Sequence, residues 1–275
     1  MNRDDIIPIV FRNLDELRHR VVRILVVFLF FFAFLLFFSI KDITLFGRTF
    51  PFITPDIYHN ISAQILQAIE KWVLLPNTKL IIIKPADGLT ADAYVSMFVS
   101  LILSMPVIVY EIGMFLGPAL KKSEKLLLRT ILVPASLLFL AGSLMGLLWI
   151  APTLFRIFNS FDIGIGSQTT MSLMSFISFL IIYIISFGIS FEVPVFMYGL
   201  TRAGMVMADT WAKNWRYAVI GSLFFGLIFS PGVTGFTEVL MALPMIGLYF
   251  SGIYFSKRYE KKFGTHDSNT VSEAL

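Results

Sequence analysis

The sequence predicts an all-α integral membrane protein whose six transmembrane helices leave both termini on the cytoplasmic side. Three observations carry this prediction. Hydrophobic residues make up 57% of the 275 residues and charged residues only 15%, whereas soluble proteins carry about 25% charged residues. The apolar residues form segments long enough to cross a hydrocarbon core of about 30 Å. Lysine and arginine collect at both termini and in alternate connections, as the positive-inside rule predicts for cytoplasmic segments.

The first predicted span covers residues 21–40 and is rich in phenylalanine. It is not typical of a cleaved signal peptide, because its leader carries acidic residues among the arginines and no small-residue cleavage site follows. Ahead of it, apolar residues recur at steps of three and four, which predicts an amphipathic helix lying at the membrane interface. These residues are Ile6, Val10, Leu14, Leu17 and Val21.

Residues 41–88 have a mixed composition with four prolines, at positions 51, 55, 76 and 85, and are predicted to form an extracytoplasmic loop. An amphipathic stretch within this loop predicts a short helix. Its apolar face would contain Ile57, Ile61, Ile65, Ile69, Trp72 and Val73, and its polar face Asn60, Gln64, Gln67 and Lys71.

The remaining spans are predicted at residues 93–115, 130–151, 172–200, 217–229 and 239–254, with the last two short. Most of them contain a proline, which removes a helix hydrogen bond and favours a bend. No repeat relates the two halves, which argues against an inverted-repeat transporter. We therefore predict one membrane domain over residues 1–260 and a polar cytoplasmic tail over 261–275.

Acidic residues in apolar spans cost about 2.5 to 3.5 kcal/mol on insertion scales, so each is a candidate functional residue. Glu192 lies deep in the fourth span, where it either is protonated and hydrogen-bonded or draws water into the bilayer. Glu238 opens the sixth span, where the helix macrodipole or a partner would account for it. Glu111 lies at the inner end of the second span, where snorkelling explains it.

Two further glutamates lie among basic residues on the predicted cytoplasmic face. Glu16 is four residues from both Arg12 and Arg20, the spacing of intrahelical ion pairs worth a few tenths of a kcal/mol. Glu124 has basic neighbours at positions 121, 125 and 129. Composition alone favours simple ion pairing for Glu16, and Glu124 could pair with its basic neighbours in the same way.

Several classes of chemistry lack support in the sequence. There is no cysteine, and the three histidines are dispersed, so neither thiol chemistry nor a metal site is predicted. No phosphate-binding loop, zinc-protease motif or nucleophile elbow occurs, and no cofactor is predicted. The basic residues flank apolar spans, so cytoplasmic retention explains the net charge of +4 better than nucleic-acid binding. We expect a protein that is not an enzyme.

Several motifs occur in register with the six spans. They are NLDELRHR at residues 13–20; SMP at 104–106, then Tyr110, FLGPAL at 115–120 and Glu124; FGISFEVP at 187–194; and Arg216-Tyr217, Ser230-Pro231 and Ala242-Leu243-Pro244. Together they resemble the TatC family, the core subunit of the twin-arginine protein translocase. The resemblance covers nearly the whole chain except the loop at 41–88 and the last few residues.

The resemblance implies a concave, glove-like bundle in the cell membrane that receives the twin-arginine signal peptides of folded cargo. Glu16 and Glu124 would accept the two guanidinium groups, whose planar fork matches a carboxylate as lysine does not. Arg18 and Pro118 would shape that site. This reverses the preference for simple ion pairing at Glu16.

The resemblance also implies roles inside the membrane. Glu192 would hydrate and thin the bilayer, and Glu238, with the last two spans, would face single-span TatA or TatB partners. Self-association and transport driven by the proton-motive force are expected as well.

The chain departs from the family pattern at three places: Asn13 replaces a frequent histidine, Glu111 replaces a common glutamine, and no aspartate follows Pro231. The missing aspartate affects the predicted contact with a TatA or TatB partner on the extracytoplasmic side.

One alternative function is a secondary transporter or channel for a small solute that uses Glu192. Another is an enzyme or a respiratory-complex subunit, but neither a catalytic dyad nor a haem-ligating histidine lies within a span.

Overall fold

The structure, a computed structural model, describes residues 3–45, 48–76, 78–116, 122–167, 170–230 and 235–263. Within these ranges the side chains of residues 3–14, 43–45, 48–49, 116, 122–131 and 263 are not described. Five described helices are long and apolar enough to cross a membrane: Asp15–Phe37, Asp87–Phe115, Leu132–Gly164, Leu173–Arg202 and Phe236–Lys262, and Trp215–Phe229 is a shorter apolar helix. Each of these segments overlaps one of the six predicted spans, so the predicted all-α membrane fold is confirmed.

The chain forms two compact units. The first contains residues 1–132 and 151–181, and the second contains residues 133–150 and 182–275. Helices α4 (Lys122–Met145) and α6 (Leu173–Phe191) contribute residues to both units.

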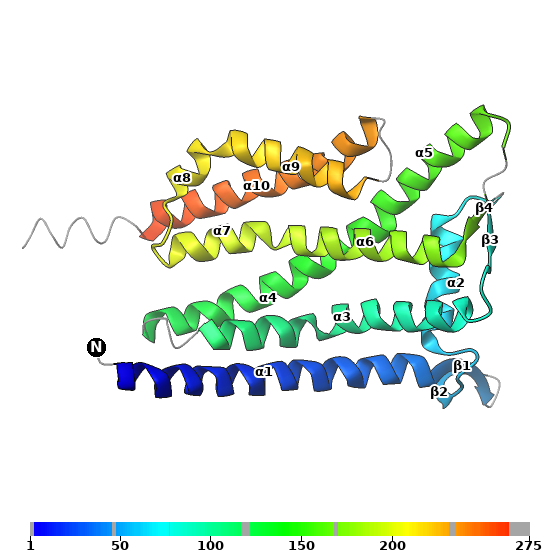
Figure 1. Ribbon diagram of the computed structural model, residues 1–275, viewed down its shortest axis with the longest axis horizontal. Helices are drawn as coiled ribbons and strands as arrows, with labels where there is room; N and C mark the ends of the chain where they lie inside the picture. The colour runs from blue at the N-terminus through cyan, green and yellow to red at the C-terminus, as the bar shows by residue number, and fades with distance from the viewer. Residues whose placement is uncertain are drawn as a thin grey trace, which may run out of the picture. The chain divides into compact units, whose positions relative to one another are not determined.

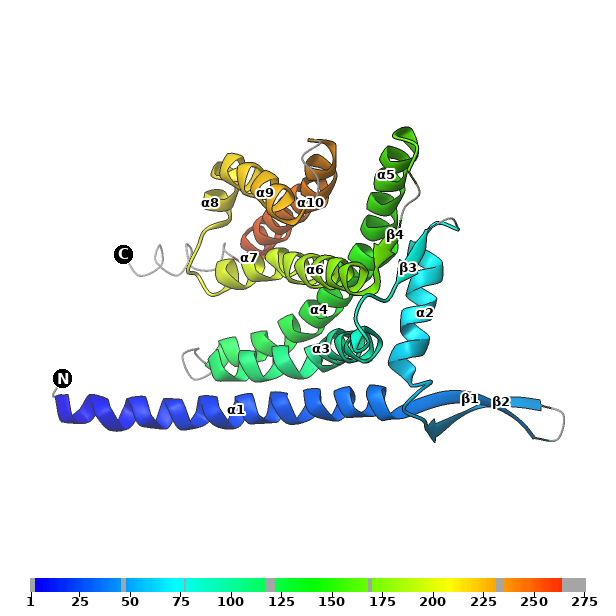
Figure 2. The same ribbon diagram turned by 45° about the vertical axis from the view of Figure 1, so that its right-hand side comes forward.

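In the first unit, α1 (Arg3–Phe37) lies side by side with α3 (Asp87–Leu116), as Figure 1 and Figure 2 show. The helix predicted ahead of the first span is present, and it is continuous with that span, because α1 runs through both. No glycine or proline lies between Pro8 and Gly47, and extending a helix costs less than nucleating another. The helix nevertheless ends at Phe37, three residues before the predicted end of the span.

A β-hairpin that the sequence did not predict follows α1 directly. Strands β1 (Phe38–Leu45) and β2 (Arg48–Pro55) pair antiparallel, with Phe38 opposite Pro55. The apolar residues at 38–40 look like a continuation of the first span, although aromatic and β-branched residues also favour strands. A shorter strand, β3 (Lys79–Ile81), pairs parallel with β4 (Thr170–Ser172).

The amphipathic helix predicted in the loop is confirmed as α2 (Ile61–Val73), which packs on α3 and α5 (Ala151–Gly164). Ile61, Ile69 and Val73 of its predicted apolar face are buried. Asn60 does not lie on an exposed polar face, because it is the buried N-cap whose Oδ1 accepts a 2.7 Å hydrogen bond from the Ala63 N–H. Trp72, on the same apolar face, is 61% exposed.

The third span continues well beyond its predicted end at residue 151. Helix α4 passes through a π-helical turn, η2 (Gly146–Ile150), into α5, which ends at Gly164. The fourth span is interrupted at Glu192 between α6 and α7 (Val193–Arg202). Pro194, which has no N–H to donate, lies two residues after the interruption.

The second unit is completed by α8 (Ala208–Lys213), α9 (Trp215–Phe229) and α10 (Phe236–Phe263), and α10 packs against α7, α8 and α9. The fifth span is short, as predicted. The prediction that the sixth is short is wrong, because α10 has 28 residues. Its last turns are rich in lysine and arginine, which favour helix while keeping their charged groups in water.

Glycines allow close packing between the second-unit parts of α4, η2 and α6. A Cβ on Gly142 would overlap the carbonyl oxygen of Phe187, and one on Gly146 would lie 2.8 Å from the carbonyl oxygen of Tyr183. On the facing helix, a Cβ on Gly188 would lie 2.6 Å from Ser143 Oγ. Small residues at such contacts let helix backbones approach closely, as is typical of membrane helices.

Candidate functional site

A cluster of four charged side chains joins α1 to α3 in the first unit. Arg20 Nη2 and Nε donate to Glu16 Oε1 at 2.6 and 3.1 Å, and Arg20 Nη1 donates to Glu111 Oε2 at 2.8 Å. Arg23 Nη1 donates to Glu111 Oε1 at 3.2 Å. The predicted ion pair between Glu16 and Arg20 is therefore present, and Arg20 also bridges to a second carboxylate.

The members of this cluster differ in exposure. The Glu111 side chain is 5% exposed and that of Arg20 is 14%, whereas those of Glu16 and Arg23 are 37% and 65% exposed. The explanation of Glu111 as a snorkelling residue is wrong, because its carboxylate is buried against two guanidinium groups. A buried carboxylate needs such partners to offset its desolvation. In the sequence, the one sign of this role was that residue 111 is a glutamate where the family commonly has a glutamine.

The other predicted members of the cytoplasmic site are less fully described. Arg18 is exposed on α1. Pro118 lies outside the described residues. Glu124 is the third residue of α4, but its side chain is among those not described. A site that combines Glu16 with Glu124 therefore stays a prediction.

Glu192 lies within the fourth span, at the break between α6 and α7. Its backbone carbonyl accepts a 2.9 Å hydrogen bond from the Phe196 N–H, so the helical hydrogen bonding resumes directly after Glu192. Its side chain is half-buried, and Oε1 is buried without a hydrogen-bond partner among the described residues. A buried carboxylate oxygen of this kind favours the entry of water.

Glu238 lies in the first turn of α10 and is 8% exposed. Its Oε2 accepts a 3.2 Å hydrogen bond from Thr237 Oγ1. Its backbone packs against Gly226 of α9, where a Cβ would overlap the Glu238 carbonyl oxygen. This position suits an acid at a helix N-terminus, and a role in partner binding stays a prediction.

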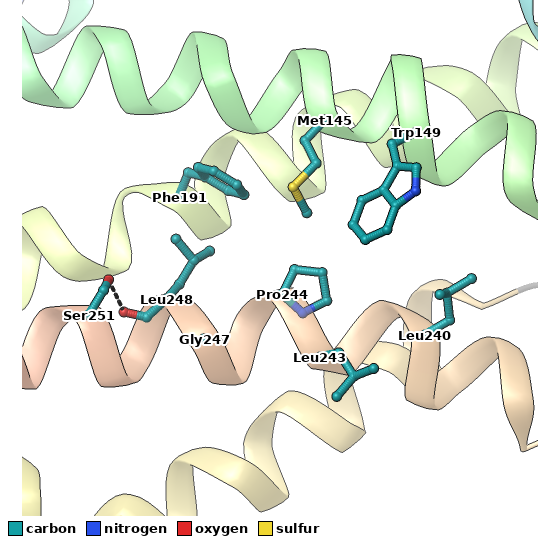
Figure 3. Close-up of a pocket in the computed structure, with 9 residues that line it drawn as sticks. All are labelled: Met145, Trp149, Phe191, Leu240, Leu243, Pro244, Gly247, Leu248 and Ser251. Carbon is teal, nitrogen blue, oxygen red and sulfur yellow. Dashed lines mark hydrogen bonds between the residues drawn. The ribbon is translucent and has the colours of Figure 1, made fainter.

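The sequence reasoning missed an apolar pocket in the second unit. Its volume is about 370 Å³, and Figure 3 shows Phe191, Met145 and Trp149 facing residues of α10 across it. Its other lining residues are Leu240, Leu243, Pro244, Gly247, Leu248 and Ser251. The pocket offers dispersion contacts but few polar groups. Over the described part of the chain, no group of three or more potential ligands could hold a metal ion.

Comparisons with known proteins agree with this architecture. A family model described as Sec-independent protein translocase protein (TatC) matches residues 12–244. The chain is 36% identical over 251 residues to the protein of that name from Cenarchaeum symbiosum (strain A), covering 91% of this chain and 95% of the relative. It is 29% identical over 262 residues to that of Escherichia coli (strain K12), covering 95% and 93%.

The fold is also that of a known receptor. A crystal structure of the twin-arginine translocase receptor TatC matches with a TM-score of 0.67 and 27% identity, over 89% of this chain and 98% of that one. The helices and these matches define a multi-pass membrane protein of a protein translocase, and not an enzyme. The chain belongs to the TatC family. Neither the solute-transporter nor the enzyme alternative is supported.

Proposed function

We propose that this translocase component binds twin-arginine signal peptides at its cytoplasmic face, with Glu16 and Glu124 as the arginine acceptors. One observation carries the proposal: Glu16 Oε1 already accepts both Nε and Nη2 of an arginine, Arg20. The carboxylate is therefore held in a geometry that suits a guanidinium fork. Its 37% exposure leaves it accessible to a peptide.

The chemistry of this acceptor favours arginine over lysine. A guanidinium presents several N–H groups in one plane, whereas an ammonium is a compact, strongly hydrated point charge. Hydrogen bonds between ionised partners are also shorter and stronger than neutral ones. Arg18 on α1 and Pro118 before α4 would shape the surroundings of the two carboxylates.

Binding of a synthetic twin-arginine peptide to the purified full-length protein in detergent tests the proposal, with a twin-lysine peptide for comparison. We expect Glu16→Gln and Glu124→Gln each to weaken twin-arginine binding about tenfold or more, since a hydrogen bond to a charged group contributes roughly 1.5 to 3 kcal/mol. Asp209→Asn is the matched control, because that carboxylate is 88% exposed on α8. Equal binding of both peptides, or no effect of either glutamate substitution, would refute the site.

We also propose that α9 and α10 receive single-span partners of the TatA or TatB type, with Glu238 at the contact. Support comes from the exposed apolar residues of α9, among them Phe224 and Ile228, which are 59% and 71% exposed. Transport would draw on the proton-motive force, and copies of the chain would associate within the complex.

Glu192 is proposed to hydrate the bilayer locally. The unpartnered Oε1 at the break in the fourth span supports this role, because a carboxylate in hydrocarbon gains most from water when the protein supplies no donor. Water drawn to this level would thin the barrier that a cargo must cross.

A further inference from the structure

Arg20 is shared between two carboxylates that differ in depth. It gives Nε and Nη2 to Glu16 on its own helix and Nη1 to Glu111 on α3, 91 residues away in sequence. The Glu16 acceptor is thus already occupied by a guanidinium that the chain itself supplies. Any arginine that binds Glu16 from outside must compete with Arg20.

The two halves of this bridge are not equally easy to break. Glu16 is 37% exposed, so water and salt screen its pair with Arg20. Glu111 is 5% exposed, and among the described residues the removal of Arg20 would leave its buried carboxylate with only the 3.2 Å contact from Arg23. Because an underpaired buried charge is strongly unfavourable, Arg20 leaves Glu16 more readily than it leaves Glu111.

We propose that Arg20 is an internal stand-in for the peptide arginine and that Glu111 is the positioning residue that retains Arg20 when the peptide displaces it from Glu16. The inference rests on the proposed function of Glu16. During the exchange the peptide guanidinium replaces that of Arg20 on Glu16. Arg20 keeps its bond to Glu111 throughout. The guanidinium group of Arg23 is 65% exposed, so water can solvate it during the exchange. No carboxylate loses its cation at any point.

This competition has a consequence for specificity. Arg20 holds Glu16 through two N–H groups, so a ligand must match that fork to displace it. A lysine ammonium cannot reproduce the planar pair of donors. Arg20 therefore competes more effectively with lysine-bearing peptides than with arginine-bearing ones. Part of the selectivity then comes from weaker binding of the wrong ligand.

Peptide binding to full-length variants in detergent tests this exchange. We expect Glu111→Gln to weaken twin-arginine binding about tenfold, because Arg20 then pairs with Glu16 alone. In the double variant Glu111→Gln with Arg20→Gln, the competitor is gone, so twin-arginine affinity should return to at least the wild-type value. Its ratio of twin-arginine to twin-lysine affinity should fall several-fold below that of the wild type. Arg156→Gln, an exposed arginine on α5, is the control and should change neither affinity.

The outcomes separate this inference from the proposed function. If the wild type fails to distinguish the two peptides, or Glu16→Gln has no effect, the receptor site itself is wrong. If those results hold but Glu111→Gln binds as the wild type does, only the role of Glu111 is refuted. A double variant that folds, by circular dichroism and size-exclusion profile, yet binds no better than Glu111→Gln would assign Glu111 a purely structural role. Because the double variant removes both charges of the Arg20–Glu111 pair, it leaves neither of them buried without its partner.

Discussion

Carboxylates in or beside the apolar spans meet three different local environments. Glu111 is held by two guanidinium groups, Glu238 accepts a hydrogen bond from its neighbour Thr237, and Glu192 has one buried oxygen without a described partner. Paired carboxylates can remain ionised in a buried setting, whereas an unpartnered one favours water. The partner of each carboxylate, rather than its depth alone, therefore decides what it can do.

Outside the spans, Asp56 organises the turn between β2 and α2. Its Oδ2 lies 2.8 Å from Lys41 Nζ, and its Oδ1 accepts hydrogen bonds from the backbone N–H groups of Tyr58 and His59 at 2.9 and 3.1 Å. The ammonium of Lys41, followed by the backbone donors, holds the pKa of Asp56 well below its usual range. A depressed pKa in the folded state stabilises the fold at pH values above the pKa of the unfolded carboxyl, about 3.9. This contribution is lost as pH falls below that value.

We expect Asp56→Asn to lower the thermal unfolding temperature at about pH 7, because the amide carries no charge for Lys41. The variant should also lose less stability than the wild type between about pH 5 and pH 3. Thermal unfolding in detergent, followed by circular dichroism, measures both effects. Asp42→Asn, at an exposed position on β1, is the control. If Asp56→Asn shows the same acid sensitivity as the wild type, Asp56 does not cause it.

Sequence reasoning identified the candidate residues better than their partners. Glu16 was singled out by its motif, and its pair with Arg20 follows from four-residue spacing. The contact between Arg20 and Glu111 joins positions 91 residues apart. No local pattern encodes a contact of that kind, because it depends on how α1 and α3 lie against each other. The role of Glu111 was therefore missed although the residue itself was noted.

Among the secondary-structure elements, the sequence predicted the number and place of the apolar helices but not their ends. Hydropathy marks where a segment is apolar, whereas a helix can continue through polar residues if nothing interrupts it. The run from α4 to α5 therefore passes Arg156 and Asn159 before it ends at Gly164. In the opposite direction, Phe38 and Ile40 extend the apolar run of the first span but lie in β1.

The packing of α4 against α6 in the second unit gives a prediction about glycine. We expect Gly142→Ala to destabilise the protein by about 1 to 3 kcal/mol, because its Cβ would overlap backbone and ring atoms of α6. Gly221→Ala on α9 is the matched control, since nothing lies within 4 Å of its Cβ position. That change should be neutral or stabilise the helix by up to about 1 kcal/mol. Unfolding titrations in mixed detergent compare the two, and equal effects would contradict the close approach.

Whether the fifth span crosses the membrane determines on which side of it the C-terminus lies relative to the N-terminus. Helix α9 has 15 residues, or roughly 22 Å at 1.5 Å per residue, against a hydrocarbon core of about 30 Å. A short span can still cross if the bilayer thins locally. If α9 crosses, the chain has an even number of crossings and both termini share one side. If α9 does not cross, the termini lie on opposite sides. The cytoplasmic position of both termini, and the single membrane domain over residues 1–260, stay predictions.

Single-cysteine labelling in the full-length protein answers this directly, because the chain contains no cysteine of its own. We expect a membrane-impermeant maleimide added from outside to label Tyr58→Cys and Phe236→Cys, whose native side chains are 88% and 64% exposed. The same reagent should label Asp209→Cys and Ser268→Cys only in inverted vesicles. The pair that flanks α9, Asp209 and Phe236, reports its crossing, and Ser268 reports the side of the C-terminus. Labelling of Asp209→Cys and Phe236→Cys from the same side would show that α9 does not cross. Labelling of Ser268→Cys from outside would place the C-terminus on the outer side. That result would contradict the cytoplasmic position that the positive-inside rule predicts from its lysines and arginines.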